Sequence, residues 1–370
     1  MLKEEIEIAQ RLVKTDAYQM SVGEIVNMYK NDELVVNPDF QRLYRWEIGQ
    51  KSKLIESLLL GIPIPSIFVF ERDDSTWELV DGLQRISTLL EFMGELKADN
   101  GDGLRPPIAL VATKYLPSLD KAVWEESELI CDVPTDEQHP IKSPQQLAIK
   151  RSRLSVEILK RPSDNATKYD LFQRLNGGGT AANPQELRNC IAIMVNQEYA
   201  GFMRSLAESE DFRTVLSASE DQLRKQRDME YVSRFLVHTY VPYDGKLDVE
   251  EYIDQGIVRL AAENKTQEAA IAFKATFRLL NQCFGQDALR RRQDGVPTGR
   301  VGLAAFECIA IGMAKNIASI QSRAAPVEYV RNRIEEFWAQ PEIEAFYSPG
   351  LRGTVRIQRT IPFGSDWFSQ

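Results

Sequence analysis

The chain has 370 residues, of which 43% are hydrophobic and 27% charged, so it can bury a sizeable core and is expected to form two domains or subdomains. Its formal net charge of -9 argues against a protein with a basic surface that binds long nucleic acid non-specifically, but a local basic cleft is compatible with this charge. Cysteine spacing shows no CxxC pair and suggests neither a zinc site nor a disulfide framework, so a reducing cytoplasm is expected. The charged first residues do not resemble a signal peptide, and no apolar run approaches the roughly 20 residues of a membrane span, so no membrane partner is expected.

Two helices are predicted near the start of the chain. Ser21 followed by Glu24 has the pattern of a capping box, which predicts a helix beginning there. A β-rich piece and an Asn-Pro-Asp turn follow. The second helix is predicted before Gly61, where apolar residues recur at helical spacing at Leu54, Ile55, Leu58 and Leu59.

Residues 66–82 read as two apolar strands joined by a turn at Asp73-Asp74-Ser75, which predicts a hairpin. Its second strand runs directly into a helix in the stretch LVDGLQRISTLLEFMG, residues 79–94. A strand that turns into a helix through a glycine lets the backbone approach a ligand closely. The corner between them is therefore the first candidate site.

At this corner, Gly82 precedes the first helical N–H groups, which suit an anion beyond the helix start. Arg85 would add a permanent charge in the fork geometry that matches phosphate, and Asp81 could hold Mg²⁺ or orient a water molecule. The structural alternative is that Asp81 only caps the helix and Arg85 is a surface ion-pair partner.

A second cluster, PDFQRLYRWE, spans residues 38–47 and combines arginine with aromatic residues, a combination that suits stacking on a base and pairing with phosphate. Its candidate ligands are Gln41, Arg42 and Arg45. The alternative is a helix-entry loop in which the aromatic side chains are core anchors.

A third cluster, FQRLNGGGTAANPQELRN, spans residues 172–189, after a strand predicted at 152–161. Arg174 and Asn176 precede its three glycines, which suggest either close backbone approach to a ligand or an ordinary helix end. Asn183 and Pro184 then mark a helix start. No Lys-Ser/Thr follows the glycines, so this is not a Walker loop. From about residue 196 the pattern is helical almost to the end.

Together, FQRLYRW, VDGLQRISTLL and LFQRLNGGGT…QELRN resemble the three signature segments of domain-of-unknown-function family 262, related to the N-terminal half of GmrS/GmrD-type modification-dependent restriction systems. The resemblance implies an α+β protein, with a ParB/sulfiredoxin-like α/β domain over residues 1–195 and an all-helical domain over 196–370. The family's Asp-Gly-Gln-Gln-Arg motif, associated with nucleotide binding and hydrolysis, falls on residues 81–85. Leu83 stands where the family has glutamine.

The resemblance implies a site for a nucleoside triphosphate, ATP or GTP, with Mg²⁺. We expect one cleft in which Asp81, Gln84 and Arg85 are catalytic and Asp81 is the metal ligand. The residues expected to bind the nucleotide are Gln41, Arg42, Arg45, Gly82, Arg85, Arg174 and Asn176.

Many relatives carry an HNH-type nuclease domain, which needs histidine as base and ligand. This chain has two histidines, His139 in a predicted loop and His238 in an apolar helix, where a packed core residue is expected. We therefore expect no HNH nuclease here, but a nucleotide-dependent sensor or regulatory subunit of a prokaryotic defence or restriction system, acting with a separate effector nuclease.

Two alternatives remain open. One is a non-catalytic module that binds DNA, perhaps modified DNA, through Arg42, Arg45 and the segment LRRRQDGVPTGR at residues 289–300. The structural alternative for that segment is a solvent-exposed helix end, formed by Arg290, Arg291 and Arg292, without a role in binding. The other is a ParB-like nuclease, for which Asp81 is the main candidate metal ligand.

Overall fold

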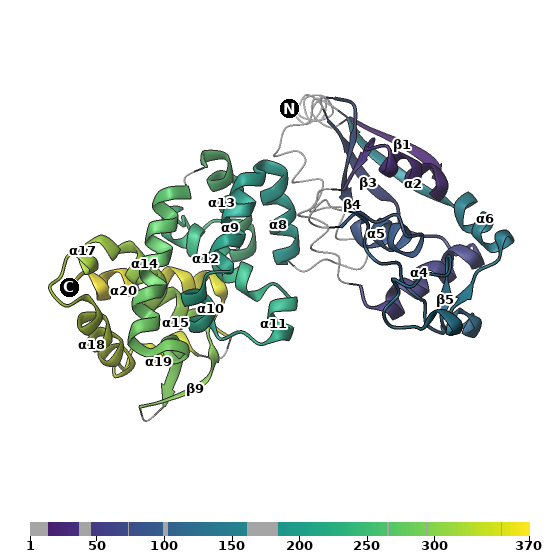
Figure 1. The fold of residues 1–370 in the computed structure, drawn as a ribbon. Coiled ribbons are helices and arrows are strands. Elements are labelled where there is room, and N and C mark those ends of the chain that lie inside the picture. Colours follow the sequence, from purple (N-terminus) through teal and green to yellow (C-terminus); the bar gives the residue numbers. More distant parts are fainter. Residues whose placement is uncertain are drawn as a thin grey trace. The chain divides into compact units, whose positions relative to one another are not determined.

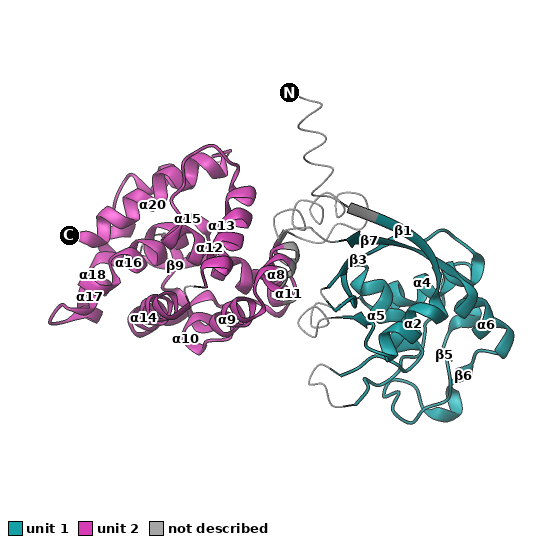
Figure 2. Cartoon of the chain, turned by 90° about the horizontal axis from the view of Figure 1, so that it is seen from above, with its two compact units in different colours: residues 1–181 teal, residues 182–370 magenta. Residues whose placement is uncertain are grey.

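The structure is a computed structural model that describes residues 14–36, 46–72, 74–98, 103–160, 184–264, 266–293, 295–348 and 350–370. The chain divides into two compact units, residues 1–181 and 182–370, shown in separate colours in Figure 2. Each unit has its own core. No helix among the described residues is long and apolar enough to cross a membrane.

Unit 1 is built on a mixed five-stranded sheet in the order β1-β7-β3-β4-β2. The pairs β1–β7 and β3–β4 are antiparallel, whereas β3–β7 and β2–β4 are parallel. Its strands are β1 (Lys14–Ser21), β2 (Leu34–Val35), β3 (Ile67–Glu71), β4 (Trp77–Asp81) and β7 (Arg153–Lys160). The predicted β3–β4 hairpin and the strand predicted at 152–161 are both confirmed.

The helices of unit 1 are α2 (Val22–Lys30), α4 (Ile48–Leu60), α5 (Leu83–Phe92) and α6 (Ser143–Arg151). Figures 1 and 2 show α2, α4 and α5 together on one side of the sheet. Buried aliphatic residues of these helices pack with those of the strands into one core. Between α5 and α6 lie short pieces only, Pro117–Leu119 and Thr135–Glu137 as 3₁₀ turns and β5 (Ala122–Val123) paired with β6 (His139–Pro140).

The Ser21 half of the predicted capping box and the predicted end of the second helix at Gly61 are present. The Ser21 hydroxyl accepts the Glu24 N–H at 3.1 Å and starts α2. Gly61 ends α4 in the left-handed region at φ 68°. These caps satisfy backbone groups that a helix terminus leaves without an intrahelical partner.

Unit 2 is mostly helical (Figure 1). Its longer helices are α8 (Pro184–Val195), α9 (Gln197–Ala207), α10 (Glu210–Leu216), α12 (Arg227–Tyr240), α13 (Val249–Glu263), α14 (Thr266–Phe284), α18 (Pro326–Trp338) and α20 (Gly353–Ser369). Shorter turns are α11 (Glu220–Arg224), the 3₁₀ turn Gly285–Asp287, α15 (Leu303–Ala305), the π-helical turn Phe306–Ile311, α16 (Gly312–Lys315), α17 (Ile317–Gln321) and α19 (Ile343–Phe346).

The prediction of an all-helical C-terminal region is wrong in one place. Residues Arg290–Gln293 (β8) and Val296–Val301 (β9) form an antiparallel hairpin. The helix-end interpretation of the arginine run at 290–292 is therefore wrong too. Arg291 pairs with Glu344 at 2.6 Å, and the Arg292 guanidinium lies 4.3 Å from the centre of the Phe284 ring. These internal contacts engage two arginines of the segment considered for DNA binding.

Candidate functional site

The corner between β4 and α5 is shaped by Gly82. Its φ is 101°, in the left-handed region that side chains rarely adopt, and a Cβ there would lie 2.5 Å from Cγ2 of Ile67. Only glycine therefore lets the strand turn into the helix against β3. Gly82 itself is the N-cap and supplies no side-chain cap, so the alternative in which Asp81 caps α5 is wrong.

Arg85 and Asp81 form an ion pair within this corner. Nη2 of Arg85 donates to Oδ2 of Asp81 at 2.8 Å, and the two side chains are 13% and 27% exposed respectively. Nη1 donates to the carbonyl oxygens of Pro65 and Ser66 in the segment before β3. Arg85 thus holds Asp81 and the start of β3 together. It is more buried than expected for the alternative in which it is only a surface ion-pair partner.

Gln84 links this corner to the second cluster. Its Oε1 accepts the backbone N–H of Trp46 at 3.1 Å. Trp46 ends the FQRLYRW segment and leads into α4. The structure therefore brings together the ends of two segments that are far apart in sequence, at the side chain of a predicted site residue.

The remaining predicted ligands, Gln41, Arg42, Arg45, Arg174 and Asn176, lie outside the described residues. The convergence of all three clusters on one cleft stays a prediction. What the structure describes of it is the corner formed by Asp81, Gly82, Gln84 and Arg85 with the Trp46 backbone.

The QELRN end of the third cluster forms a buried network that the sequence analysis did not anticipate. Arg188 in α8 is 1% exposed and donates through Nε to Oδ1 of Asp254 at 2.6 Å, with Nη2 bonded to Glu250. Gln185 Nε2 donates to Asn189 Oδ1 at 2.8 Å and to Ser233 Oγ at 3.1 Å. The network ties α8 to α12 and α13.

Charge within this network is balanced. Burial would lower the pKa of Arg188, but the carboxylates of Asp254 and Glu250 raise it above its ordinary value. Burial would raise the pKa of Glu250, but Arg188 and Arg234 lower it. Polar residues at positions i, i+3 and i+4 of α8 share one face, and this spacing is a sequence signal that could have indicated the network.

His238 lies in α12 and is 1% exposed, as predicted for a core histidine. Its ring stacks near that of Tyr252, with centroids 5.6 Å apart. Neither ring nitrogen has a hydrogen-bond partner among the described residues. No group of three or more His, Cys, Asp or Glu side chains placed to hold a metal ion occurs in the described part of the chain.

A comparison with protein families identifies the part of the chain that holds this corner. The model for the GmrSD restriction endonuclease, N-terminal domain, matches residues 22–193. Residues 22–193 are a GmrSD N-terminal domain. No match was found among curated proteins or solved structures.

The GmrSD N-terminal domain contains both the β4–α5 corner and most of α8. The match implies a role in a restriction or defence system. It confirms the resemblance drawn from the three sequence segments. The matched region also crosses from unit 1 into unit 2, because α8 packs with α9 and α13.

Proposed function

We propose that this chain is a nucleotide-binding sensor or regulatory subunit of a prokaryotic restriction or anti-phage defence system, with the nuclease on a separate effector protein. The ligand is a nucleoside triphosphate, ATP or GTP, bound with Mg²⁺, and DNA is a candidate trigger. We also assign unit 1 to a ParB/sulfiredoxin-like fold, on the strength of the three sequence segments. Hydrolysis is part of the proposal.

The observation that carries the proposal is the β4–α5 corner of a GmrSD N-terminal domain. Gly82 leaves the first turn of α5 without a side-chain cap, and backbone N–H groups at such a helix start favour phosphate oxygens. The side chain of Asp81 is 27% exposed, so solvent and a ligand can reach it.

The residues present fit Mg²⁺ bound with a nucleotide. Arg85 engages Oδ2 of Asp81, while Oδ1 has no hydrogen-bond partner among the described residues. One carboxylate is sufficient, because Mg²⁺ is commonly held by one or two carboxylates together with substrate phosphates and water. The metal would offset phosphate charge, and Arg85 would keep the Asp81 carboxylate in place.

The proposal is tested with the full chain and each nucleoside triphosphate, with and without Mg²⁺ and DNA, by titration calorimetry and phosphate release. Asp81→Asn keeps an oxygen for Arg85 but loses the charge, so Mg²⁺-dependent binding and release should fall at least tenfold. Asp32→Asn is the matched control, because Asp32 is an exposed acid of unit 1 whose carboxylate pairs with Lys97.

Two results would overturn the proposal. One is a parent protein that binds no nucleoside triphosphate under any of these conditions. The other is an Asp81→Asn variant that binds and hydrolyses like Asp32→Asn, since the corner would then have only a structural role.

A further inference from the structure

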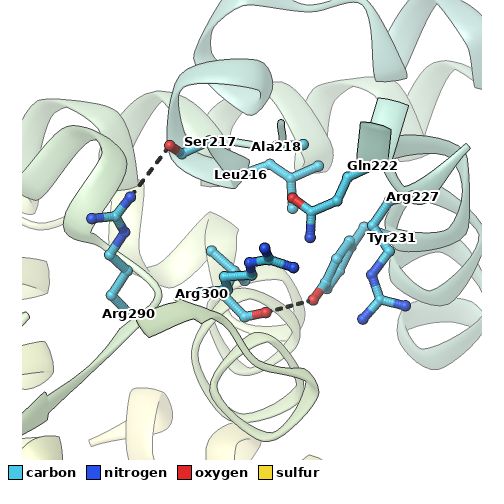
Figure 3. Close-up of a pocket in the computed structure, with 9 residues that line it drawn as sticks. Leu216, Ser217, Ala218, Gln222, Arg227, Tyr231, Arg290 and Arg300 are labelled. Atoms are coloured by element: carbon cyan, nitrogen blue, oxygen red, sulfur yellow. Dashed lines mark hydrogen bonds between the residues drawn. The ribbon is translucent and has the colours of Figure 1, made fainter. Parts of the chain in front are cut away.

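A small pocket in unit 2 collects three arginines. It lies where the end of α10, the turn α11 and helix α12 meet the β8–β9 hairpin, and encloses ≈ 340 Å³ including space open to solvent. Arg227, Arg290 and Arg300 line it together with Ser217, Gln222 and Tyr231 (Figure 3). None of the lining residues is acidic.

The frame of the pocket is fixed by hydrogen bonds. The Tyr231 hydroxyl donates to the Val301 carbonyl oxygen at 2.9 Å, which holds the end of the hairpin against α12. Arg290 is oriented toward Ser217, with Nη2 to Oγ at 3.4 Å (Figure 3). These two hydrogen bonds hold the hairpin against α12 and the end of α10.

Two of the arginines have acidic neighbours outside the lining. Arg227 pairs with Glu230 at 2.6 Å, and Arg290 lies 3.3 Å from Asp287. Arg300 is exposed and has no hydrogen bond or ion pair among the described residues. It is the charge best placed to take an added ligand.

Donors face one another inside the pocket. Oε1 of Gln222 accepts the backbone N–H of Ser219 at 3.1 Å, so its amide nitrogen is directed away from that bond. In Figure 3 the amide nitrogen of Gln222 points toward the guanidinium of Arg300, which can only donate. Two donor groups in this arrangement can share an oxyanion as their common acceptor.

We propose that this pocket binds the phosphate group of a small anionic ligand. Arginine forks match phosphate oxygens, and Arg300 has no acidic partner among the described residues and lies in a pocket whose lining has no acidic side chain. The pocket is too small to enclose a whole nucleotide and suits one phosphate group, either free or at the end of a larger molecule.

A small concave pocket also differs from a DNA-binding surface. Duplex DNA presents phosphates along an extended backbone and is held by many cations spread over a face. Here Arg291 and Arg292, the hairpin's other arginines in the β8 run, are engaged with Glu344 and Phe284. The arrangement favours a small ligand over a nucleic-acid strand.

The test uses the full chain at low ionic strength, titrated in the calorimeter with inorganic phosphate, with ATP and with duplex DNA in separate arms. Arg300→Ala should weaken phosphate binding about tenfold or more, because it removes a charge-assisted contact. Arg259→Ala is the matched control, since it removes an exposed arginine of unit 2, 58% exposed, far in sequence from the pocket.

The arms separate the sources of the phosphate group. Binding of inorganic phosphate that depends on Arg300 identifies a free-phosphate site, and Arg300-dependent binding of ATP alone identifies a phosphorylated ligand. Arg300→Ala should leave the Mg²⁺-dependent binding of ATP at the β4–α5 corner unchanged, whereas Asp81→Asn should lower that binding and leave the binding of inorganic phosphate unchanged, so failure of the proposed corner site is distinguishable from failure here. Equal affinities in Arg300→Ala and Arg259→Ala, or Arg300-dependent binding of DNA only, would overturn the proposal.

Discussion

Two short motifs that look alike in sequence have opposite environments in the structure. DGLQR places Arg85 at a corner where it is 13% exposed and its partner Asp81 is 27% exposed. QELRN places Arg188 inside unit 2, where it is 1% exposed and bonded to two acids of α13. Arg85 and Asp81 are therefore accessible to solvent in part, whereas Arg188 is buried in a core.

The difference shows what makes a polar motif a candidate site. A buried charge is costly unless it is fully paired, so Arg188 and Asp254 are held in one geometry and have little freedom to meet a ligand. The corner combines a left-handed glycine, an uncapped helix start and a partly exposed carboxylate. Those features leave bonding capacity for something outside the chain.

The largest effect is expected for Arg188→Met. The substitution keeps much of the side-chain volume but removes the guanidinium that pairs with Asp254, whose side chain is 10% exposed, whereas Glu250 keeps its pair with Arg234. The free energy of unfolding should fall by about 3–5 kcal/mol. Urea unfolding followed by circular dichroism measures it. Arg259→Met, at an exposed pair with Glu263, should cost less than about 1 kcal/mol, and equal losses in the two variants would contradict the role of the network.

Gly82→Ala should be the next most harmful. It combines backbone strain at φ 101° with a Cβ 2.5 Å from Ile67, and should cost about 2–4 kcal/mol. Gly61→Ala is a matched control, because Gly61 also has positive φ but nothing lies within 4 Å of the added Cβ. The difference in unfolding free energy between the two variants isolates the steric contribution at the corner. If Gly61→Ala is as harmful, close packing does not explain the glycine at 82.

Arg85→Ala should lower the free energy of unfolding by about 1.5–3 kcal/mol, because it removes hydrogen bonds to a carboxylate and to two carbonyl oxygens. Arg72→Ala serves for comparison, because Arg72 pairs with Glu78 but is 36% exposed. Its loss should stay below about 1 kcal/mol. A smaller loss for Arg85→Ala than for Arg72→Ala would show that the corner does not depend on its arginine.

The sequence predicted most of the framework of unit 1. Ser21 and Gly61 mark helix ends through their own backbone and hydroxyl chemistry, and the alternating strands of residues 66–82 give a hairpin. Local signals of this kind need no knowledge of distant residues. The position of Gly82 at the corner was predicted for the same reason.

The parts that were missed depend on tertiary contacts. The run Arg290–Arg292 has no apolar alternation, and it becomes a strand because it pairs with β9 and its side chains meet Glu344 and Phe284. The network around Arg188 was missed because a polar helix face looks the same in sequence whether it meets water or acids from another helix. The pocket at Arg300 joins residues 216–231 to residues 290–301, which no local pattern indicates.

The smallest expected effect is on the pH dependence of the free energy of unfolding, through His238 beside the buried network. Burial, followed by the positive charges of Arg234, Arg356 and Lys315, holds the pKa of His238 well below its ordinary value. The unfolded chain therefore takes up a proton at His238 as the pH falls through about 6.5, while the folded chain does not. The contribution of His238 to the free energy of unfolding is fully present above that pH and declines below it, by at most about 1.4 kcal/mol per pH unit.

His238→Leu should flatten this decline between pH 7.5 and 5.5. Urea unfolding at each pH measures it, and His139→Gln, at an exposed position, should keep the parent slope. An unchanged slope in His238→Leu would mean that other groups set the pH dependence of unit 2, and that the cations beside the network do not act on its stability through this ring.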